Sequence, residues 1–243
     1  MKFQFSPTLF ALGMAISIAG CKKAEKKPAI PITSAREAAI RADMPLLPVT
    51  QGDFWRYAVH LEIPADAAKS GTQEVDKTIQ RSRTYVGRIS PGAGYPDTDC
   101  FEVTTPDFPT EREFVEIHDD KILLRGSLIM RTEASKPLWY DQPIPFVTAG
   151  VNGGDELREF NVGSQTRSRK IQVVGREEVT VPAGKFPSIR LLMGGMDGTF
   201  ELRRTIWFSP GVGIVREEKT RYHSDKLILR ETQELLETSL KKR

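Results

Sequence analysis

Hydrophobic and polar residues alternate in short runs over most of the chain, beginning near residue 55. The clearest run extends from Trp55 to Ile63, where every second side chain is apolar and those between are mostly polar or charged. This period of two is typical of a β-strand that presents one face to a core. Comparable runs, each predicted to form a strand, occupy residues 84–89, 101–104, 113–117, 122–125, 170–174, 178–181, 189–193, 199–203, 205–208, 212–217 and 227–230.

Turn-forming residues separate these runs. His118–Lys121 and the Asp197-Gly198 pair each predict a hairpin turn between two strands. Gly175 interrupts another run and predicts a bulge or sharp bend. Residues 66–80, and residues 131–169 with their prolines and glycines, are expected to form the long connections.

Short strands joined by close turns, with almost no helical periodicity, predict an all-β fold with minor α content. We expect an antiparallel meander that curls into an open or incomplete β-barrel. Residues 231–240 suit either a terminal helix or a strand, and the alternation before them favours a strand followed by a fraying tail.

The first residues have the features of an export signal. A lysine at position 2 precedes an apolar run, Leu9–Ala19, which is too short to span a bilayer. The run ends in Ile18-Ala19-Gly20-Cys21, which resembles the lipobox of bacterial lipoproteins. This resemblance implies that Cys21 receives a diacylglyceryl group, becomes the first mature residue and anchors the protein to a membrane through acyl chains such as palmitate. An ordinary cleaved signal, in which Cys21 is incidental, is the alternative.

Lysines and prolines are frequent in residues 22–47, which predicts a tether. The lysines beside Cys21 either attract anionic head groups or simply begin a solvated linker. Ser34-Ala35-Arg36-Glu37 has the spacing of a capping box and predicts one short helix within the tether. The expected organisation is a signal peptide at residues 1–20, a lipidated tether with its helix at 21–47 and a single antiparallel β domain at 48–243.

The predicted location is extracytoplasmic, with the chain lipid-anchored to a bacterial membrane. Lys22 follows the cysteine where an aspartate commonly signals inner-membrane retention in Gram-negative bacteria. For bacterial lipoproteins, the absence of this aspartate implies the outer membrane, with the protein facing the periplasm. The formal net charge is only +3, and acidic and basic residues are mixed along the chain, which argues against a nucleic-acid partner.

Residues that could carry chemistry are scattered. The three histidines, His60, His118 and His223, lie far apart in the sequence, so we expect no metal, no cofactor and no catalytic residue. Of the two cysteines, Cys100 has no partner if Cys21 carries lipid. Cys100 lies in an alternating run, and a buried core residue is favoured over a reactive thiol.

Aromatic side chains are the candidate ligand-binding residues. If the sheet curls, those on its concave face would hold an acyl chain or another apolar ligand, and a fully packed core is the alternative. Trp139 and Tyr140 form a further aromatic pair in a predicted loop, which marks either a contact surface or a plug at one end of the sheet. The candidates are Trp55, Tyr57, Trp139, Tyr140, Phe200, Trp207 and Phe208.

Three motifs, at residues 48–57, 179–186 and 206–215, occur together. In this combination they resemble bacterial envelope proteins of the TapB-like kind or of domains of unknown function, which are distantly similar to the half-barrels of Lol-type lipoprotein carriers. The motifs are architectural, because they form strand ends, tight turns and apolar anchors. The resemblance implies a fold and a compartment but no reaction.

Residues 49–54 and 147–150 show a short internal echo, since each follows a proline-containing segment and introduces a strand-rich one. Chance is favoured over two related halves, because few residues match.

The leading hypothesis for function is a non-enzymatic, membrane-anchored lipoprotein that binds an apolar ligand or an envelope protein. The alternatives are a structural or assembly subunit of an envelope complex and an unrecognised hydrolase.

Overall fold

The computed structural model describes residues 45–64, 75–132, 135–161 and 168–242. Within these ranges the chain forms twelve β-strands, all in one sheet, and one short 3₁₀ helix. None of the described segments is a helix long and apolar enough to cross a membrane. The predicted signal peptide and the predicted tether helix lie outside the described residues. The elements are β1 (Phe54–Ile63), β2 (Val75–Ile89), β3 (Thr98–Thr104), β4 (Glu111–Ile117), β5 (Lys121–Ile129), β6 (Leu138–Thr148), β7 (Glu156–Asn161), β8 (Ser168–Val181), β9 (Gly184–Asp197), β10 (Phe200–Ser209), β11 (Gly213–His223), β12 (Lys226–Thr238) and η1 (Ser239–Lys242).

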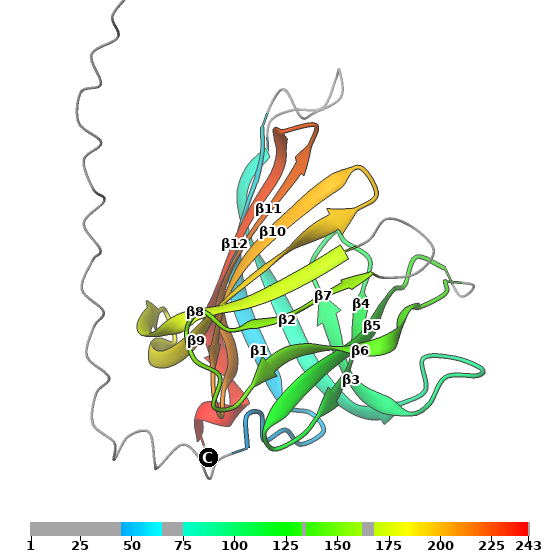
Figure 1. The fold of residues 1–243 in the computed structure, drawn as a ribbon, viewed down its shortest axis with the longest axis vertical. Helices are drawn as coiled ribbons and strands as arrows, with labels where there is room; N and C mark the ends of the chain where they lie inside the picture. The colour runs from blue at the N-terminus through cyan, green and yellow to red at the C-terminus, as the bar shows by residue number, and fades with distance from the viewer. Residues whose placement is uncertain (1–44, 65–74, 133–134, 162–167, 243) are drawn as a thin grey trace, which may run out of the picture.

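The sheet is antiparallel, with the strand order β6-β5-β4-β3-β2-β1-β12-β11-β10-β9-β8-β7. Strands that follow one another in sequence pair with each other, except β6 and β7, and β1 pairs with β12. The sheet curls until β6 and β7 lie near each other without pairing (Figure 1). This confirms the predicted all-β fold and its open barrel, and it leaves a seam between β6 and β7.

The alternating pattern of β1 gives the burial that it predicts. Trp55, Tyr57, Val59 and Leu61 are buried, whereas Arg56 and His60 between them are exposed. Burial of large side chains such as these stabilises the fold by about 1.5–3 kcal/mol each. The strand favoured for residues 231–240 is also confirmed, because β12 continues to Thr238 before η1 begins.

Two segments that were predicted to be connections contain strands. The start of β2 falls within residues 66–80, and its first residues are mostly exposed, so they lack the alternation of a half-buried strand. Residues 131–169 contain β6, β7 and the start of β8. Pro143 and Pro145 lie in β6, where an edge strand tolerates the missing N–H groups.

The β10–β11 turn packs against β1. Trp55 Nε1 donates a hydrogen bond to the Val212 carbonyl at 2.6 Å, and the Tyr57 hydroxyl donates one to the Ile214 carbonyl at 3.0 Å. Gly213 lies between these acceptors with a φ of 104°, a conformation that favours glycine. The motif at residues 206–215 is therefore part of the framework of the fold.

The β8–β9 hairpin tip docks onto β12. The backbone amide of Ala183, at the tip, donates a hydrogen bond to the Leu235 carbonyl at 2.9 Å. Val181 and Phe186 on either side of the tip are buried. The motif at residues 179–186 thus folds as a strand end, a tight turn and an apolar anchor.

The two halves of the barrel, β1–β6 and β7–β12, repeat the same strand register. A cross-strand row in the first half contains Arg83, Val103, Glu111 and Ile129, and the matching row in the second half contains Ile171, Met193, Arg204 and Lys219. The β-bulges also coincide. One follows Tyr85 in β2 and Val173 in β8, and another follows Phe114 in β4 and Trp207 in β10.

The loops before β1 and β7 have the same conformation. In each loop an aspartate carboxylate accepts a hydrogen bond from the backbone amide three residues earlier, at 2.6 Å for Asp53 and 2.7 Å for Asp155. The glycine before each aspartate, Gly52 or Gly154, has a positive φ, of 92° and 98° respectively.

The described part of the barrel therefore contains a structural repeat. Its equivalent segments are residues 49–54 and 151–156, so residues 147–150 are not the counterpart of residues 49–54, and that short sequence match is due to chance. The repeat shows in the hydrogen bonds and not in the sequence, because only a glycine and an aspartate are needed to form the turn.

Candidate functional site: the cavity inside the open barrel

Two adjoining cavities lie inside the curled sheet. The larger one, which we name the outer cavity, has a volume of about 490 Å³, and the smaller one, the inner cavity, has a volume of about 140 Å³. The two cavities share the lining residues Glu111, Leu124, Ser127, Tyr140 and Arg204. These shared residues form the boundary layer between the two.

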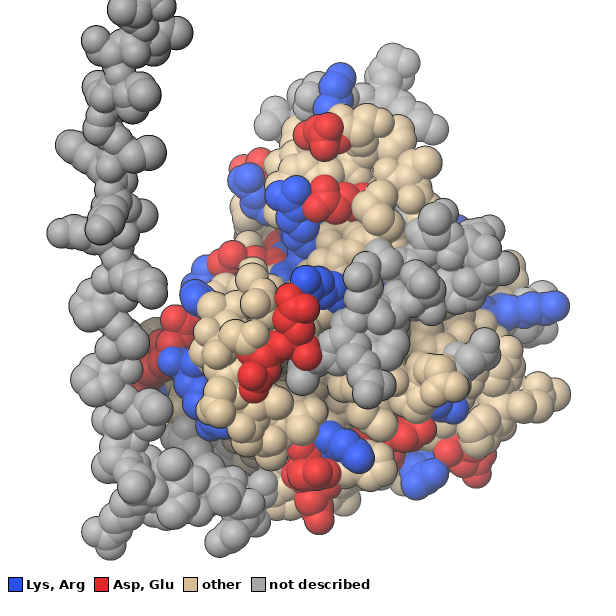
Figure 2. All heavy atoms as spheres, in the orientation of Figure 1, with Lys and Arg blue, Asp and Glu red and all other residues tan. Residues whose placement is uncertain are grey.

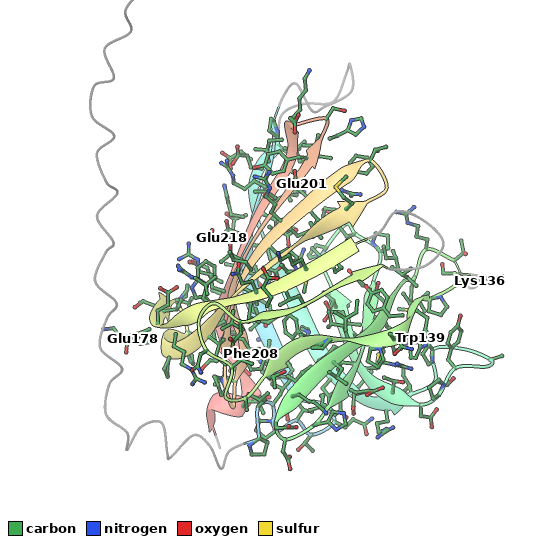
Figure 3. All side chains as sticks on the ribbon, viewed as in Figure 1. Lys136, Trp139, Glu178, Glu201, Phe208 and Glu218 are labelled. Carbon is green, nitrogen blue, oxygen red and sulfur yellow. The ribbon has the colours of Figure 1, made fainter. Side chains whose placement is uncertain are left out.

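The outer cavity lies between the two ends of the sheet. One wall contains Leu138 and Ile144 of β6, and the opposite wall contains Met193 of β9 and Leu202 of β10. Lys136, which precedes β6, adds a charge at the margin of the molecule (Figure 3). The cavity therefore occupies the part of the barrel that strand pairing leaves open.

The inner cavity is lined mainly by apolar side chains, and the ion-paired Arg83 and Glu113 also line it. Figure 3 shows one of them, Phe208, in the interior of the curled sheet. Phe146 of β6 packs edge-on against it, with ring centroids 6.2 Å apart. The apolar lining residues outside the boundary layer are Leu47, Phe101, Val115, Ile122, Phe146, Phe208 and Ile214.

A buried polar network contributes Arg83, Glu113 and Arg204 to the cavity lining. Arg204 forms an ion pair with Glu217, and Gln233 Nε2 donates a hydrogen bond to the same carboxylate at 3.1 Å. Arg83 contacts Glu113 at 2.9 Å. Buried charges of this kind are tolerated only when they are paired and hydrogen-bonded.

A second part of this network joins β2 to β12. Arg81 donates hydrogen bonds to Glu231 at 2.7 Å and to Gln233 at 3.0 Å. Burial pushes the pKa of Glu231 upward, but the hydrogen bond from Arg81 and the charges of Lys219 and Arg81 outweigh it, so the pKa lies below its ordinary value. The pKa of Glu113 is lowered in the same way, since Arg83 and nearby arginines outweigh burial.

Glu111 behaves differently from these carboxylates. Burial, and then repulsion by Glu113, raise the pKa of Glu111 above its ordinary value. Among the described residues, its carboxylate makes no hydrogen bond and no ion pair, and the same holds for the hydroxyl of Ser127. Both side chains belong to the boundary layer. Partly buried polar groups without a protein partner are candidates to contact a ligand.

Two of the aromatic ligand-binding candidates line these cavities, Tyr140 and Phe208. Trp55 and Tyr57 are fully buried in the core and line neither. Phe200 also lines neither and lies near Arg221, whose guanidinium is 4.2 Å from its ring centroid. A ligand-binding role for these residues stays a prediction.

Trp207 and Trp139 line neither cavity. Trp207 Nε1 donates a hydrogen bond to Glu177 at 2.6 Å, and the Arg216 guanidinium lies 5.1 Å from the indole centroid. Trp139 packs against Tyr95, with ring centroids 5.2 Å apart. Through these contacts both tryptophans pack within the fold. Their predicted contact with a ligand stays a prediction.

Sequence reasoning missed the polar members of the boundary layer. Glu111, Ser127 and Arg204 each occupy an inward position of a strand whose other inward positions are partly apolar. A charged residue at an inward position was the available signal. The β-bulges in β4 and β10 hide it, because each bulge changes which residues face inward.

The histidines and Cys100 lie away from the cavities. His60 contacts Asp76 at 3.4 Å and His118 contacts Glu116 at 3.7 Å, and all four side chains are at least partly exposed. The described residues contain no group of three or more histidine, cysteine or acidic side chains that could hold a metal ion. Cys100 is fully buried, as predicted, and burial raises the pKa of its thiol to about 12.

On the face visible in Figure 2, lysine and arginine side chains are interspersed with aspartate and glutamate. The described residues show no large patch of one sign on that face.

Comparisons with known proteins give no family for this chain. No family model matches the sequence, and no curated protein matches it either. The resemblance to TapB-like and Lol-type proteins therefore stays a prediction.

Two solved structures are similar to this chain over 81% of its length. One is a candidate lipoprotein from Parabacteroides distasonis, with 13% sequence identity, 99% of that chain covered and a TM-score of 0.44. The other is a candidate exported protein with a YmcC-like fold from Bacteroides fragilis, with 14% identity, 99% of that chain covered and a TM-score of 0.46.

Proposed function

We propose that the chain is a non-enzymatic, lipid-anchored binding module of the bacterial envelope, whose open barrel takes up an apolar ligand. The observation that carries this proposal is the mainly apolar inner cavity, which adjoins the larger outer cavity at the boundary layer. Ligand pockets are typically about 300–1,000 Å³ in volume. The outer cavity, at about 490 Å³, has a size that suits a small molecule.

A long hydrocarbon chain suits this arrangement. The narrow inner cavity would hold the end of the chain between rings such as Phe208 and Phe146. The rest of the chain would pass the boundary layer and lie along Leu138 and Leu202 in the outer cavity. Its removal from water would drive binding.

The proposed anchor is Cys21, which lies outside the described residues. Acyl chains on this cysteine would hold the module at a membrane, since each buried methylene contributes about 0.8 kcal/mol. The motif around Cys21 supports a location outside the cytoplasm, and Lys22 favours the periplasmic side of the outer membrane. The tether would let the barrel reach ligands near that surface.

A structural or assembly subunit is the second candidate. The unpaired edges of β6 and β7 favour it, because a free sheet edge can accept a strand from a partner protein. Crosslinking in cells separates the two candidates. An assembly subunit should yield one dominant protein partner, whereas a binder of small apolar molecules should not.

The test is binding of N-phenyl-1-naphthylamine, a neutral probe that fluoresces in apolar sites, to the purified full-length chain. Leu124→Trp would fill the boundary between the two cavities and should weaken binding by at least about tenfold. Leu192→Trp places the same side chain on the exposed outer side of β9 and should bind like the wild type. Equal binding by a folded Leu124→Trp variant would overturn the proposal.

A further inference from the structure

The boundary layer contains an unsatisfied acceptor. Among the described residues, Glu111 and Ser127 have no hydrogen-bond partner, although both face the two cavities. Arg204, the other charged side chain of this layer, is paired with Glu217. The layer therefore offers a ligand one carboxylate and one hydroxyl at the entrance to the inner cavity.

The internal repeat explains why these two groups are unpaired. Glu111 is the counterpart of Arg204, and Ser127 is the counterpart of Glu217, because the strand registers of the two halves coincide. In the second half the two positions form an ion pair. In the first half the two positions hold a carboxylate and a hydroxyl, which cannot form an ion pair with each other.

The surrounding charges only partly compensate Glu111. Glu113 on the same strand repels it, while Lys219 of β11, Arg204 of β10 and Arg81 of β2 attract it. Each of the three cations is also near another carboxylate, Glu217 for Arg204 and Glu231 for Arg81 and Lys219. Burial and Glu113 together outweigh them, which is why the pKa of Glu111 is raised.

A protonated amino group fits this site. It carries three hydrogen-bond donors and a positive charge, which match a carboxylate and a hydroxyl oxygen. Charge-assisted hydrogen bonds are the stronger ones, and they gain strength where water is excluded. An anionic head group would instead meet the uncompensated carboxylate.

We propose that Glu111 and Ser127 bind the ammonium group of a long-chain aliphatic amine whose hydrocarbon chain extends into the inner cavity. This inference rests on the proposed function, the uptake of an apolar ligand, and adds the chemistry of its head group. Two further cations line the outer cavity outside the boundary layer. Lys136 lies on the exposed margin, where water and salt screen its repulsion, and Arg169 donates an exposed hydrogen bond to the Met196 carbonyl at 2.9 Å. The partly buried carboxylate of Glu111 therefore decides the selectivity.

The experiment measures how well three amphiphiles of equal chain length displace N-phenyl-1-naphthylamine from the full-length chain. They are dodecylamine, dodecanol and dodecanoate, each below its micelle concentration at neutral pH. The wild type should bind the amine about tenfold more tightly than the other two, the value of one charge-assisted hydrogen bond. Glu111→Gln should bind all three about equally, and Ser127→Ala should weaken amine binding to a smaller extent.

The control is Glu178→Gln, which removes an exposed carboxylate from the β8–β9 hairpin, on the opposite side of the molecule from Lys136 (Figure 3). It should keep the wild-type preference for the amine. Equal binding of the three amphiphiles by the wild type would overturn the amine site and leave the apolar binder standing. A preference that survives in Glu111→Gln would also overturn it, and failure of all three to displace the probe would overturn both proposals.

Discussion

Glu111 and Arg204 occupy equivalent positions in the two halves of the barrel and face the same cavities with opposite charges. Only the second half places a carboxylate, Glu217, where it can pair with the charge on the neighbouring strand. The first half has Ser127 at the matching position. The repeated framework therefore supports two different tasks, an ion pair that belongs to the fold and a carboxylate that is available to a ligand.

Replacing Glu111 by glutamine should stabilise the protein at neutral pH. Folding raises the pKa of this carboxyl group, so the folded state binds its proton more tightly than the unfolded state does. Stability is then fully present below the unfolded pKa of about 4.3 and is lost as the pH rises through the folded pKa. Glu111→Gln should raise the free energy of unfolding at pH 7, and the gain should shrink towards pH 3. Urea unfolding across this range measures the effect, and a loss of stability at pH 7 would contradict it.

Breaking the ion pair of Arg204 should be costly. Arg204→Ala leaves Glu217, whose side chain is only 6% exposed, without its cation, so the free energy of unfolding should fall by about 3–5 kcal/mol. Lys185→Ala breaks an exposed pair with Glu178 and should cost no more than about 1 kcal/mol. Urea unfolding of both variants makes the comparison. Equal losses would show that the network beside the cavities is not buried in solution.

Gly213→Ala should destabilise the β10–β11 turn. The φ of 104° disfavours any side chain, and a Cβ would lie 3.3 Å from both Leu47 and Trp55. The thermal midpoint should fall by several degrees, since about 1 kcal/mol corresponds to roughly 2–4 °C in a domain of this size. Gly175→Ala is the matched control, because a Cβ there meets nothing within 4 Å. The turn would need a different conformation if Gly213→Ala melted like the wild type.

Cys21→Ala should release the chain from the membrane. The thioether-linked lipid requires the Cys21 sulfur, so the variant should incorporate no radiolabelled palmitate and should move to the soluble fraction after cell lysis. Cys100→Ala is the control for cysteine content and should remain labelled, because Cys100 is buried in the barrel. Labelling of Cys21→Ala, or unchanged fractionation, would refute the anchor.

Alternation in the sequence predicted most of the sheet, because many strands bury one face and expose the other. Alternation did not predict the strands, or parts of strands, that lack one buried and one exposed face. The first residues of β2 are mostly exposed, and β6 is an edge strand with two prolines, so neither shows a clean period of two. It also divided β10 into two runs, although residues 199–208 lie almost entirely in one strand.

The site was less accessible from the sequence than the fold. Phe208 could be proposed because aromatic side chains on a concave sheet suggest an apolar ligand. Tyr140 was proposed as part of an aromatic pair in a predicted loop, but it lies in β6. Glu111 and Ser127 could not be proposed from the sequence, since their positions relative to each other depend on the register in which β4 and β5 pair. The volume of the cavity also depends on how closely the two edges of the sheet approach each other, and no local sequence pattern predicts that distance.

The most direct test of the central claim, that the barrel holds an apolar ligand inside, is native mass spectrometry of the full-length chain after incubation with dodecanol and dodecylamine. The wild type should carry one added ligand mass, and Leu124→Trp, with its side chain in the boundary layer, should carry none. The wild type without any added mass, or the same adduct on both proteins, would contradict the account.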